Sequence, residues 1–394
     1  MFVPIFILLS ASSLFTEEMK ISEPHIRKVA IIGGGAAGLV TASVLSNSKL
    51  EVAVFEQTQL LGGVWNYAPA SSSVNPMYNS LRTNLPTEIM SISYDDPFIL
   101  RENDNTCTYS TSFATHSDVL RYIENYADKY SLRKFVLFNT TVTKATRVDG
   151  KSWSVSYQTT TAENSIQSSA DFDALIVCNG HFSKPFVPPI PGLNAFTGVS
   201  MHSIDYDKLK CDLSPINGKR VLIVGGKSSA TDMAREIIAL GVAAEVHISD
   251  RNLEYSFLKT YPVGETIPLT DAKLPSEPFF YFHPAISHVE EGTRYVKFSD
   301  SLTAEIDLIL WCTGYLYEYP FLGDLVQLEQ GKRLRGLHMQ LFHQQEPTLA
   351  FVGLPFAVVP FPLFFFQAKL LAAVFKVIAA ATNYSYPKQS IVLI

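Results

Sequence analysis

Two glycine-rich turns are the features of this 394-residue chain best suited to chemistry. The first reads GGGAAG over residues 33–38, and the second reads GGKSSA over residues 225–230. Each follows a hydrophobic run and opens a helical pattern, which places backbone N–H groups against the pyrophosphate of a dinucleotide. Two such turns predict two dinucleotides in one protein, the arrangement needed to pass a hydride from a nicotinamide to a flavin.

The first turn follows the G-x-G-x-x-G pattern, in which each glycine has a separate role. Gly33 permits the tight turn, Gly35 lets the backbone approach the pyrophosphate, and Gly38 lets the helix pack closely on the strand. Glu56 ends the next hydrophobic run, about 20 residues after the turn, where a carboxylate can bind the ribose. Because the strand, turn, helix and acid all agree, we predict a dinucleotide site here.

The second turn departs from this pattern. Gly225 stands at the first glycine position, but Lys227 replaces the second glycine and Ala230 the third. Ser228 and Ser229 keep the start of the following helix polar, so its backbone N–H groups can still face phosphates. We therefore predict a second dinucleotide site that holds its ligand less tightly through the backbone.

The residues after the second turn indicate which coenzyme binds there. A helix is predicted over 230–240 and a strand over 245–248, which leads to Asp250 and Arg251. An arginine at this place suits the 2′-phosphate of NADPH, whereas a carboxylate alone would repel that phosphate. The arginine favours NADPH over NADH, and Asp250 argues in the other direction.

The remaining hydrophobic pattern predicts the elements that position the two turns. The first unit runs as a strand from residue 28, a helix over 36–46 and a strand over 52–55. An amphipathic helix is predicted over 115–130, with an apolar face formed by Val119, Leu120, Ile123 and Tyr126. Further strands, in part an antiparallel excursion, are predicted over 135–138, 142–148, 153–159, 173–177 and 306–311.

Length and composition indicate a globular protein of two domains. The chain is 47% hydrophobic and 17% charged, without a long low-complexity tract. Its formal net charge of −6 and the lack of a clustered Lys/Arg stripe argue against a nucleic-acid surface. The sequence offers no convincing Ser/His/Asp set and no metal-ligand spacing, so we expect neither a catalytic triad nor a metal.

Both ends of the chain are apolar. Residues 1–15 are almost uncharged and precede a patch of small residues, which predicts a signal peptide over 1–19 and hence secretion. The missing basic n-region leaves an uncleaved anchor, with association to the endoplasmic reticulum membrane, as the alternative. Residues 361–381 are interrupted by Gln367, Lys369 and Lys376. Since two lysines inside a membrane span are costly, we expect a buried or partly surface-lying helix and no stable span.

The four cysteines show no spacing typical of a redox dithiol. Cys178 and Cys312 end hydrophobic strands shortly before a glycine, which is typical of small core residues. Cys107 could pair with Cys211 in a secreted protein, but spacing does not decide connectivity. The lack of C-x-x-C and C-x₄-C argues against a disulfide reductase.

Between the two turns, residues 196–206 read FTGVSMHSIDY, which fits the spacing F-x-G-x-x-x-H-x-x-x-[FY]. With the two turns, this motif resembles the flavin-containing monooxygenases, over residues 28–381 of the chain. Within that family the chain is most similar to the insect members that N-oxygenate plant pyrrolizidine alkaloids. Tyr206, in place of a tryptophan, argues against a Baeyer–Villiger monooxygenase, which otherwise has a similar layout.

The resemblance implies an α/β fold with two dinucleotide-binding, Rossmann-like domains. The larger FAD domain is expected over residues 24–184 and 316–394, and the smaller NADPH domain is inserted in it over 185–315. The proline-rich segment 185–192 reads as the linker that leaves the first domain.

The resemblance also assigns functional residues. The positions implied for FAD are Gly33, Gly35, Gly38, Glu56, Gly62, Gly63, Trp65, Arg82, Thr83, Val142 and Gln367. The positions implied for NADPH are Gly225, Ser228, Ser229 and Arg251. The stretch 312–315 matches the family's [A/C]-T-G-Y element, which implies cofactor contacts at Thr313 and Gly314. Asn84 matches an active-site asparagine and is the candidate catalytic residue.

The activity that the resemblance implies needs NADPH and O₂. The reduced flavin would capture O₂ as a C4a-hydroperoxide, and a tertiary amine or sulfide would take up one oxygen, as in detoxification of dietary alkaloids. A homo-oligomer is possible. Two alternatives remain open, a secreted FAD-binding protein with little oxygenase activity and another two-dinucleotide flavoprotein reductase. An FAD amine oxidase would need only one nucleotide turn and no Arg251.

Overall fold

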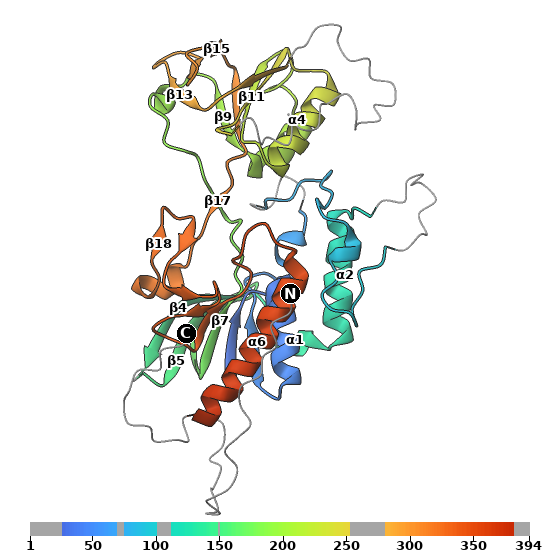
Figure 1. Cartoon of the computed structure of the whole chain (residues 1–394), viewed down its shortest axis with the longest axis vertical. Helices are drawn as coiled ribbons and strands as arrows, with labels where there is room; N and C mark the ends of the chain where they lie inside the picture. The colour runs from blue at the N-terminus through green and yellow to red at the C-terminus, as the bar shows by residue number, and fades with distance from the viewer. Residues whose placement is uncertain (1–25, 69–74, 101–111, 149, 253–279, 382–394) are drawn as a thin grey trace, which may run out of the picture.

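The computed structural model describes residues 26–68, 75–100, 112–148, 150–252 and 280–381. The predicted signal peptide and Cys107, and with it the pairing of Cys107 with Cys211, lie outside these residues. Two bodies are stacked along the long axis of the molecule (Figure 1). Each body is built around one largely parallel sheet.

The lower body contains the seven-stranded sheet, with the order β20-β21-β22-β7-β1-β2-β3. Its parallel strands are β1 (Lys28–Ile32), β2 (Glu51–Phe55), β3 (Val136–Leu137), β7 (Ala174–Val177) and β22 (Leu349–Phe351). The antiparallel edge consists of β20 (Leu337–His338) and β21 (Phe342–His343). The central strand β7 is apolar throughout, and β1 is apolar after Lys28, because both faces of the sheet are covered.

Helices cover one face of this sheet. They are α1 (Ala36–Asn47), α2 (His116–Lys129) and α6 (Pro360–Ala381). In Figure 1, α6 runs alongside α1 although more than three hundred residues separate them in sequence. The predicted amphipathic helix is confirmed as α2, which begins with a capping box between Thr115 and Asp118.

An antiparallel sheet covers the other face. Its strands are β4 (Thr140–Val148), β5 (Ser152–Thr160) and β6 (Ser165–Phe172). Trp153 is fully buried there, and its indole N–H donates to Thr348 Oγ1 at 3.0 Å. The predicted antiparallel excursion is confirmed, but β6 was missed because its residues are polar and mostly exposed. The strand expected over 135–138 is only two residues long, since a 3₁₀ turn (Leu132–Phe135) precedes it.

The upper body contains a five-stranded parallel sheet. Its order is β12 (Phe280–His283), β11 (Glu245–Ser249), β10 (Arg220–Val224), β16 (Leu308–Trp311) and β9 (Val199–His202). Helix α4 (Ser228–Leu240) packs on one face. On the other face lies the antiparallel sheet of β13 (Ile286–Val289), β14 (Tyr295–Phe298) and β15 (Thr303–Glu305).

The chain crosses between the two bodies twice, through a short antiparallel pair. Strand β8 (Lys184–Pro185) leads upward and β17 (Tyr315–Leu316) returns, with Tyr315 opposite Pro185. Short elements complete the described fold: η1 (Gly63–Trp65), η2 (Thr87–Ile89), η4 (Leu193–Ala195), η5 (Ser203–Asp205), α3 (Tyr206–Cys211), η7 (Pro320–Leu325), β18 (Leu328–Glu329) and β19 (Arg333–Leu334).

Helix α6 is the one described helix whose length and composition would suffice to cross a membrane, over Pro360–Val377. That test is also passed by core helices, and 33% of this window is buried inside the protein. Leu371 and Phe375 are among the buried residues, while Lys369 and Lys376 are exposed. The helix is therefore partly surface-lying, as the interrupted apolar stretch predicted.

Candidate active site and dinucleotide sites

The first glycine turn connects β1 to α1 with no room for side chains. Gly33 has φ +108°, and a Cβ there would lie 2.4 Å from the carbonyl oxygen of Cys178. A Cβ on Gly38 would lie only 1.9 Å from the Gly33 oxygen. The helix can therefore sit this close to β1 only if both residues are glycine.

The start of α1 is suited to an anion. Its N-cap, Gly35, provides no side-chain cap, so the backbone N–H groups of the first turn are not taken by a capping side chain. Gly35 pairs with Gly62 in a parallel bridge, and a Cβ on Gly63 would lie 3.1 Å from the Gly35 Cα. The backbone thus forms a narrow cradle that fits the pyrophosphate of FAD.

Glu56 is fixed at the end of β2 beside this cradle. Its side chain is buried, with 5% exposure, and Oε2 accepts from the Gly34 N–H at 2.7 Å. Oε1 accepts from both the N–H and the hydroxyl of Thr58, each at 2.8 Å. The carboxylate is held at the position expected for the ribose-binding acid of the FAD site.

Trp65 and Gln367 each make one contact that involves the first half of α6. The Trp65 ring lies edge-on to Phe361, with centroids 6.4 Å apart. Gln367 is buried, and its Oε1 accepts from the Gly353 N–H at 3.0 Å. The segment before α6 is therefore tied to the helix by one of the residues predicted to approach the flavin.

Asn84 follows a short pairing that fixes its backbone. Arg82 forms an antiparallel bridge with Thr115, and the buried Thr83 exchanges hydrogen bonds with Ala114. Asn84 itself is exposed, and its side chain has no hydrogen-bond partner among the described residues. A rigid backbone thus presents a carboxamide that is available to a ligand.

Val142 differs from the other predicted FAD positions. Its side chain is buried in β4, in the cluster that includes Phe55 and Trp153. The side chain is therefore part of the core, and a cofactor contact at this residue would fall to its main chain.

The second turn connects β10 to α4 in the same way as the first. Gly225 has φ +130°, and a Cβ there would lie 2.5 Å from the Cys312 oxygen. Helix α4 has no side-chain cap, so its first N–H groups are also available to phosphates. Of the predicted residues at the helix start, Ser228 is exposed and Ser229 half-buried.

Asp250 and Arg251 follow β11 beside this turn. A Cβ on Gly226 would lie 1.6 Å from Asp250 Oδ2, which shows that the carboxylate lies directly over the turn. Arg251 is exposed. The Asp250 carboxylate is therefore fixed at the second turn, and the exposed Arg251 follows it directly in the chain.

The C-T-G-Y element and the signature motif meet where the chain crosses between the bodies. The Thr313 hydroxyl donates to the Phe186 carbonyl, and the Phe186 N–H donates to the Gly314 carbonyl at 2.9 Å. His202 Nε2 also donates to the Gly314 carbonyl, at 3.0 Å, while its Nδ1 accepts from the Ile204 N–H at 3.2 Å. Both ring nitrogens are engaged and burial lowers the His202 pKa, so this histidine is structural.

Several residues that bridge the bodies were missed by sequence analysis. The buried Tyr78, six residues before Asn84, donates its hydroxyl to Asp232 on α4. Burial raises the pKa of both groups; the Asp232 carboxylate adds to the rise at Tyr78, whereas the hydrogen bond from Tyr78 partly offsets the rise at Asp232. The two residues are 154 positions apart, and no spacing rule connects them. Their hydrogen bond ties the segment that carries Asn84 to the helix of the second turn.

The cysteines are placed as core residues. Cys178 is buried and burial raises its pKa to about 12, while Cys312 packs against Met233 with sulfur atoms 3.7 Å apart. A thiol with such a pKa is not a thiolate at neutral pH, which argues against redox chemistry at this position. In the part of the chain that the structure describes, no group of three or more His, Cys, Asp or Glu could hold a metal.

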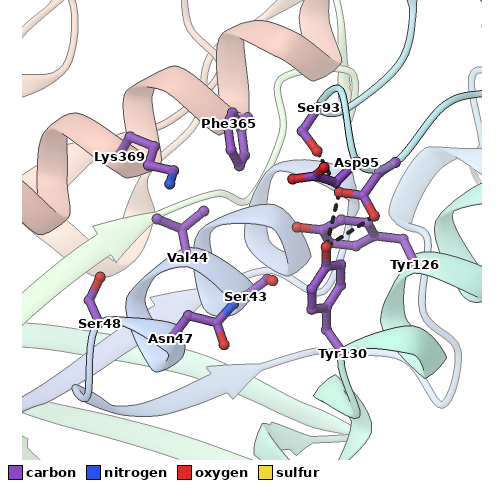
Figure 2. A pocket seen from close by; sticks show the side chains of 11 residues that line it. Ser43, Val44, Asn47, Ser48, Ser93, Asp95, Tyr126, Tyr130, Phe365 and Lys369 are labelled. Atoms are coloured by element: carbon purple, nitrogen blue, oxygen red, sulfur yellow. Dashed lines mark hydrogen bonds between the residues drawn. The ribbon is translucent and has the colours of Figure 1, made fainter.

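A cavity of about 260 Å³ lies elsewhere, between the C-terminal half of α1, the start of α6 and residues 93–96 (Figure 2). Its buried acid, Asp96, accepts from Lys129 at 2.6 Å, Ser93 at 2.6 Å and Tyr130 at 3.1 Å. The far end of α1 lines this cavity, away from the glycine turn. It belongs to the packing of α2 rather than to a dinucleotide site.

Comparison with known proteins agrees with this geometry. The flavin-binding monooxygenase-like family matches residues 26–267. A flavin-containing monooxygenase of Arabidopsis thaliana, FMO GS-OX-like 4, is 34% identical over 366 residues, which cover 88% of this chain and 75% of that protein. The S-allyl-L-cysteine S-oxygenase of Allium sativum is 32% identical, with a TM-score of 0.73 over 89% of this chain and 77% of that one.

The fold is shared more widely. OTEMO in complex with FAD and NADP is 17% identical, with a TM-score of 0.57 over 92% of this chain and 86% of that one. The chain therefore belongs to the flavin-binding monooxygenase-like family. It is a flavin-containing monooxygenase that uses FAD and NADPH.

Proposed function

We propose that this protein uses NADPH and O₂ to oxygenate a soft nucleophile, in particular the nitrogen of a tertiary amine such as a pyrrolizidine alkaloid. The resemblance to the insect N-oxygenases supports nitrogen as the target. The similarity to a plant S-oxygenase supports sulfur as the alternative atom. Both atoms carry a lone pair and need no protein nucleophile.

The observation that carries the proposal is the placement of Asn84. Its carboxamide is exposed on a backbone held by Thr83, and Tyr78 ties the same segment to the helix of the coenzyme turn. FAD held at the first glycine turn, at Gly33, Gly35 and Gly38, would supply the acceptor for the NADPH hydride and the group that activates O₂. The role of Asn84 is then to hydrogen-bond polar atoms at that place while the aromatic residues Trp65 and Phe361 exclude water.

The test of substrate class is a panel assay on the FAD-bound enzyme. Matched tertiary amines and sulfides, pyrrolizidine alkaloids included, are incubated with NADPH and O₂, and the N-oxides and S-oxides are quantified against NADPH consumed. We expect stoichiometric N-oxide. Sulfoxide alone would move the target atom to sulfur, and a yellow protein that NADPH cannot bleach under nitrogen would support an FAD-binding protein without oxygenase activity.

Asn84→Asp tests the proposed catalytic residue. We expect NADPH oxidation to persist while oxygenated product falls on the order of 10²-fold and hydrogen peroxide is released instead, because a hydrogen-bond donor has been replaced by a charge. Product, peroxide and NADPH are measured in one reaction. Fully coupled oxygenation by this variant would remove Asn84 from the mechanism.

We also propose that residues 1–19 direct the protein to the secretory pathway and that it acts outside the cell. The apolar run and the small residues that follow it support this. Expression of the full chain in insect cells, with N-terminal sequencing of protein from the medium, tests it. Protein retained in the endoplasmic reticulum membrane with an intact N-terminus would contradict it.

A further inference from the structure

A lysine of the coenzyme turn reaches across to the flavin-binding body. Lys227 is the N-cap residue of α4, at the position where the first turn has Gly35. Its ammonium lies over the ring of Phe356, 4.2 Å from the centroid. Phe356 belongs to the other body, in the segment between β22 and α6. This contact therefore joins the coenzyme turn to the segment that Gln367 ties to α6.

The contact is weak for both partners. Phe356 is 76% exposed, so little else covers its ring. Lys227 is exposed and has no carboxylate within ion-pair distance among the residues described. A cation over an exposed ring changes an equilibrium constant by a factor of only about 2 to 5.

A phosphate is a stronger partner for the same ammonium. Charge-assisted hydrogen bonds are about twice as strong as neutral ones, and the uncapped start of α4 already favours an anion. In the first turn, the missing side chain of Gly35 allows close backbone approach. In the second turn, Lys227 removes that possibility and supplies a positive charge in its place.

We propose that Lys227 binds the pyrophosphate of NADP(H), and that Phe356 holds its ammonium while the coenzyme is absent. Coenzyme binding then breaks the Lys227–Phe356 contact and releases the segment before α6. The occupancy of the coenzyme site is thereby coupled to a segment at the flavin side of the molecule.

The proposal predicts opposite effects for the two partners. Lys227→Met removes the phosphate ligand and should weaken NADP⁺ binding at least tenfold, whereas Lys227→Arg should retain most of the affinity. Phe356→Leu removes a competitor for the ammonium and should tighten NADP⁺ binding by about 2 to 5-fold. In the Lys227→Met background, Phe356→Leu should have no effect.

The experiment is calorimetric titration of NADP⁺ into the oxidised, FAD-bound enzyme for wild type, each single variant and the double variant. Phe366→Leu, which alters an aromatic residue of α6 that is 68% exposed, is the matched control and should leave the affinity unchanged. FAD content and melting temperature verify that each variant is folded. Binding of NADP⁺ requires no substrate, so the result is independent of the substrate class proposed above.

The sign of the Phe356 effect decides the matter. The proposal is supported if Phe356→Leu tightens NADP⁺ binding when Lys227 is present and has no effect in the Lys227→Met background. If Phe356→Leu leaves NADP⁺ affinity unchanged or weakens it, Phe356 does not hold the Lys227 ammonium. The same conclusion follows if Phe356→Leu changes the affinity equally in the Lys227→Met background. Full affinity in Lys227→Met overturns the role of Lys227 at the phosphates.

Discussion

The two glycine turns have the same frame but differ in how they can hold a dinucleotide. Gly33 donates its N–H to the Phe55 carbonyl, and Gly225 donates to the Ser249 carbonyl, both at 2.9 Å. Each of these glycines also lies against the carbonyl of a cysteine that directly follows the neighbouring strand. The turn itself is therefore dictated by the strand–turn–helix geometry that both domains share.

The difference lies in the residues after the first glycine. Gly38 could not accept a methyl group, whereas Ala230 occupies the same place on α4 with 1% exposure. Helix α4 must therefore stand farther from its strand than α1 does. The first turn presents backbone at close range, as a resident cofactor requires, and the second relies on side-chain charge, which suits a coenzyme that must leave after each turnover.

The largest expected effect comes from exchanging the third residues of the two turns. Gly38→Ala should displace α1, because its methyl group would meet the Gly33 oxygen at 1.9 Å. We expect FAD binding to fall at least tenfold, read from flavin absorbance per protein and from melting temperature. Ala230→Gly is the counterpart and should cost about 1 kcal/mol of stability while leaving NADP⁺ affinity within about twofold. Full FAD content in Gly38→Ala would contradict the distinction between the turns.

A smaller effect is expected at the end of β11. Arg251→Met should weaken NADP⁺ about 10 to 100-fold, since a charged hydrogen bond to the 2′-phosphate is worth about 1.5–3 kcal/mol, and should leave NAD⁺ affinity unchanged. Asp250→Ser should tighten NADP⁺ binding, because it removes a negative charge that repels the 2′-phosphate. Titrations with both nucleotides measure the two constants. An equal loss for NADP⁺ and NAD⁺ would show that Arg251 does not read the 2′-phosphate.

The last prediction concerns the pH dependence of folding stability, at the sheet of the second turn, and not ligand binding. His247 Nδ1 and His283 Nε2 lie 2.9 Å apart, with Glu245 on the other side of His247. Burial, with His247 as a further cause and Asp300 opposing it, lowers the pKa of His283 from 6.5 to about 4.

Between these two pKa values the unfolded chain binds a proton that the folded chain does not. The free energy of unfolding should therefore fall as the pH drops from 6.5 toward 4, by on the order of 2 kcal/mol between pH 7 and pH 5. Urea unfolding of the FAD-bound enzyme at pH 7 and pH 5 measures this, and His283→Gln should flatten the dependence. A steep dependence that survives the substitution would assign the effect to other groups.

Sequence reasoning was most successful where local geometry decides the structure. The strands, turns and helices of both dinucleotide units follow from hydrophobic runs and glycine positions, and all of them are confirmed. The strand β6 could not be predicted, because its polar residues are kept in the sheet by pairing with β5. Its register is a long-range property without a local pattern.

Contacts between the bodies were equally out of reach. The Tyr78–Asp232 hydrogen bond and the Lys227–Phe356 contact join residues that are far apart in sequence. In the sequence, Lys227 is recognisable only as a departure from the glycine pattern. The contact of its side chain with Phe356 depends on how the two bodies are placed. The predicted roles of Asn84 and Arg251 remain predictions, since the structure fixes their positions and not their ligands.

The paired strands β8 and β17 make the upper body a loop that begins and ends at one point. Pro185 lies opposite Tyr315, so the chain leaves the lower body and returns to it at the same antiparallel pair. Roughly a third of the chain lies between these two residues. A short turn that joins those two residues would make the lower body a continuous chain, and it would leave every strand of the lower sheet intact. An evolutionary exchange or a laboratory excision of the whole upper body would therefore need only one splice.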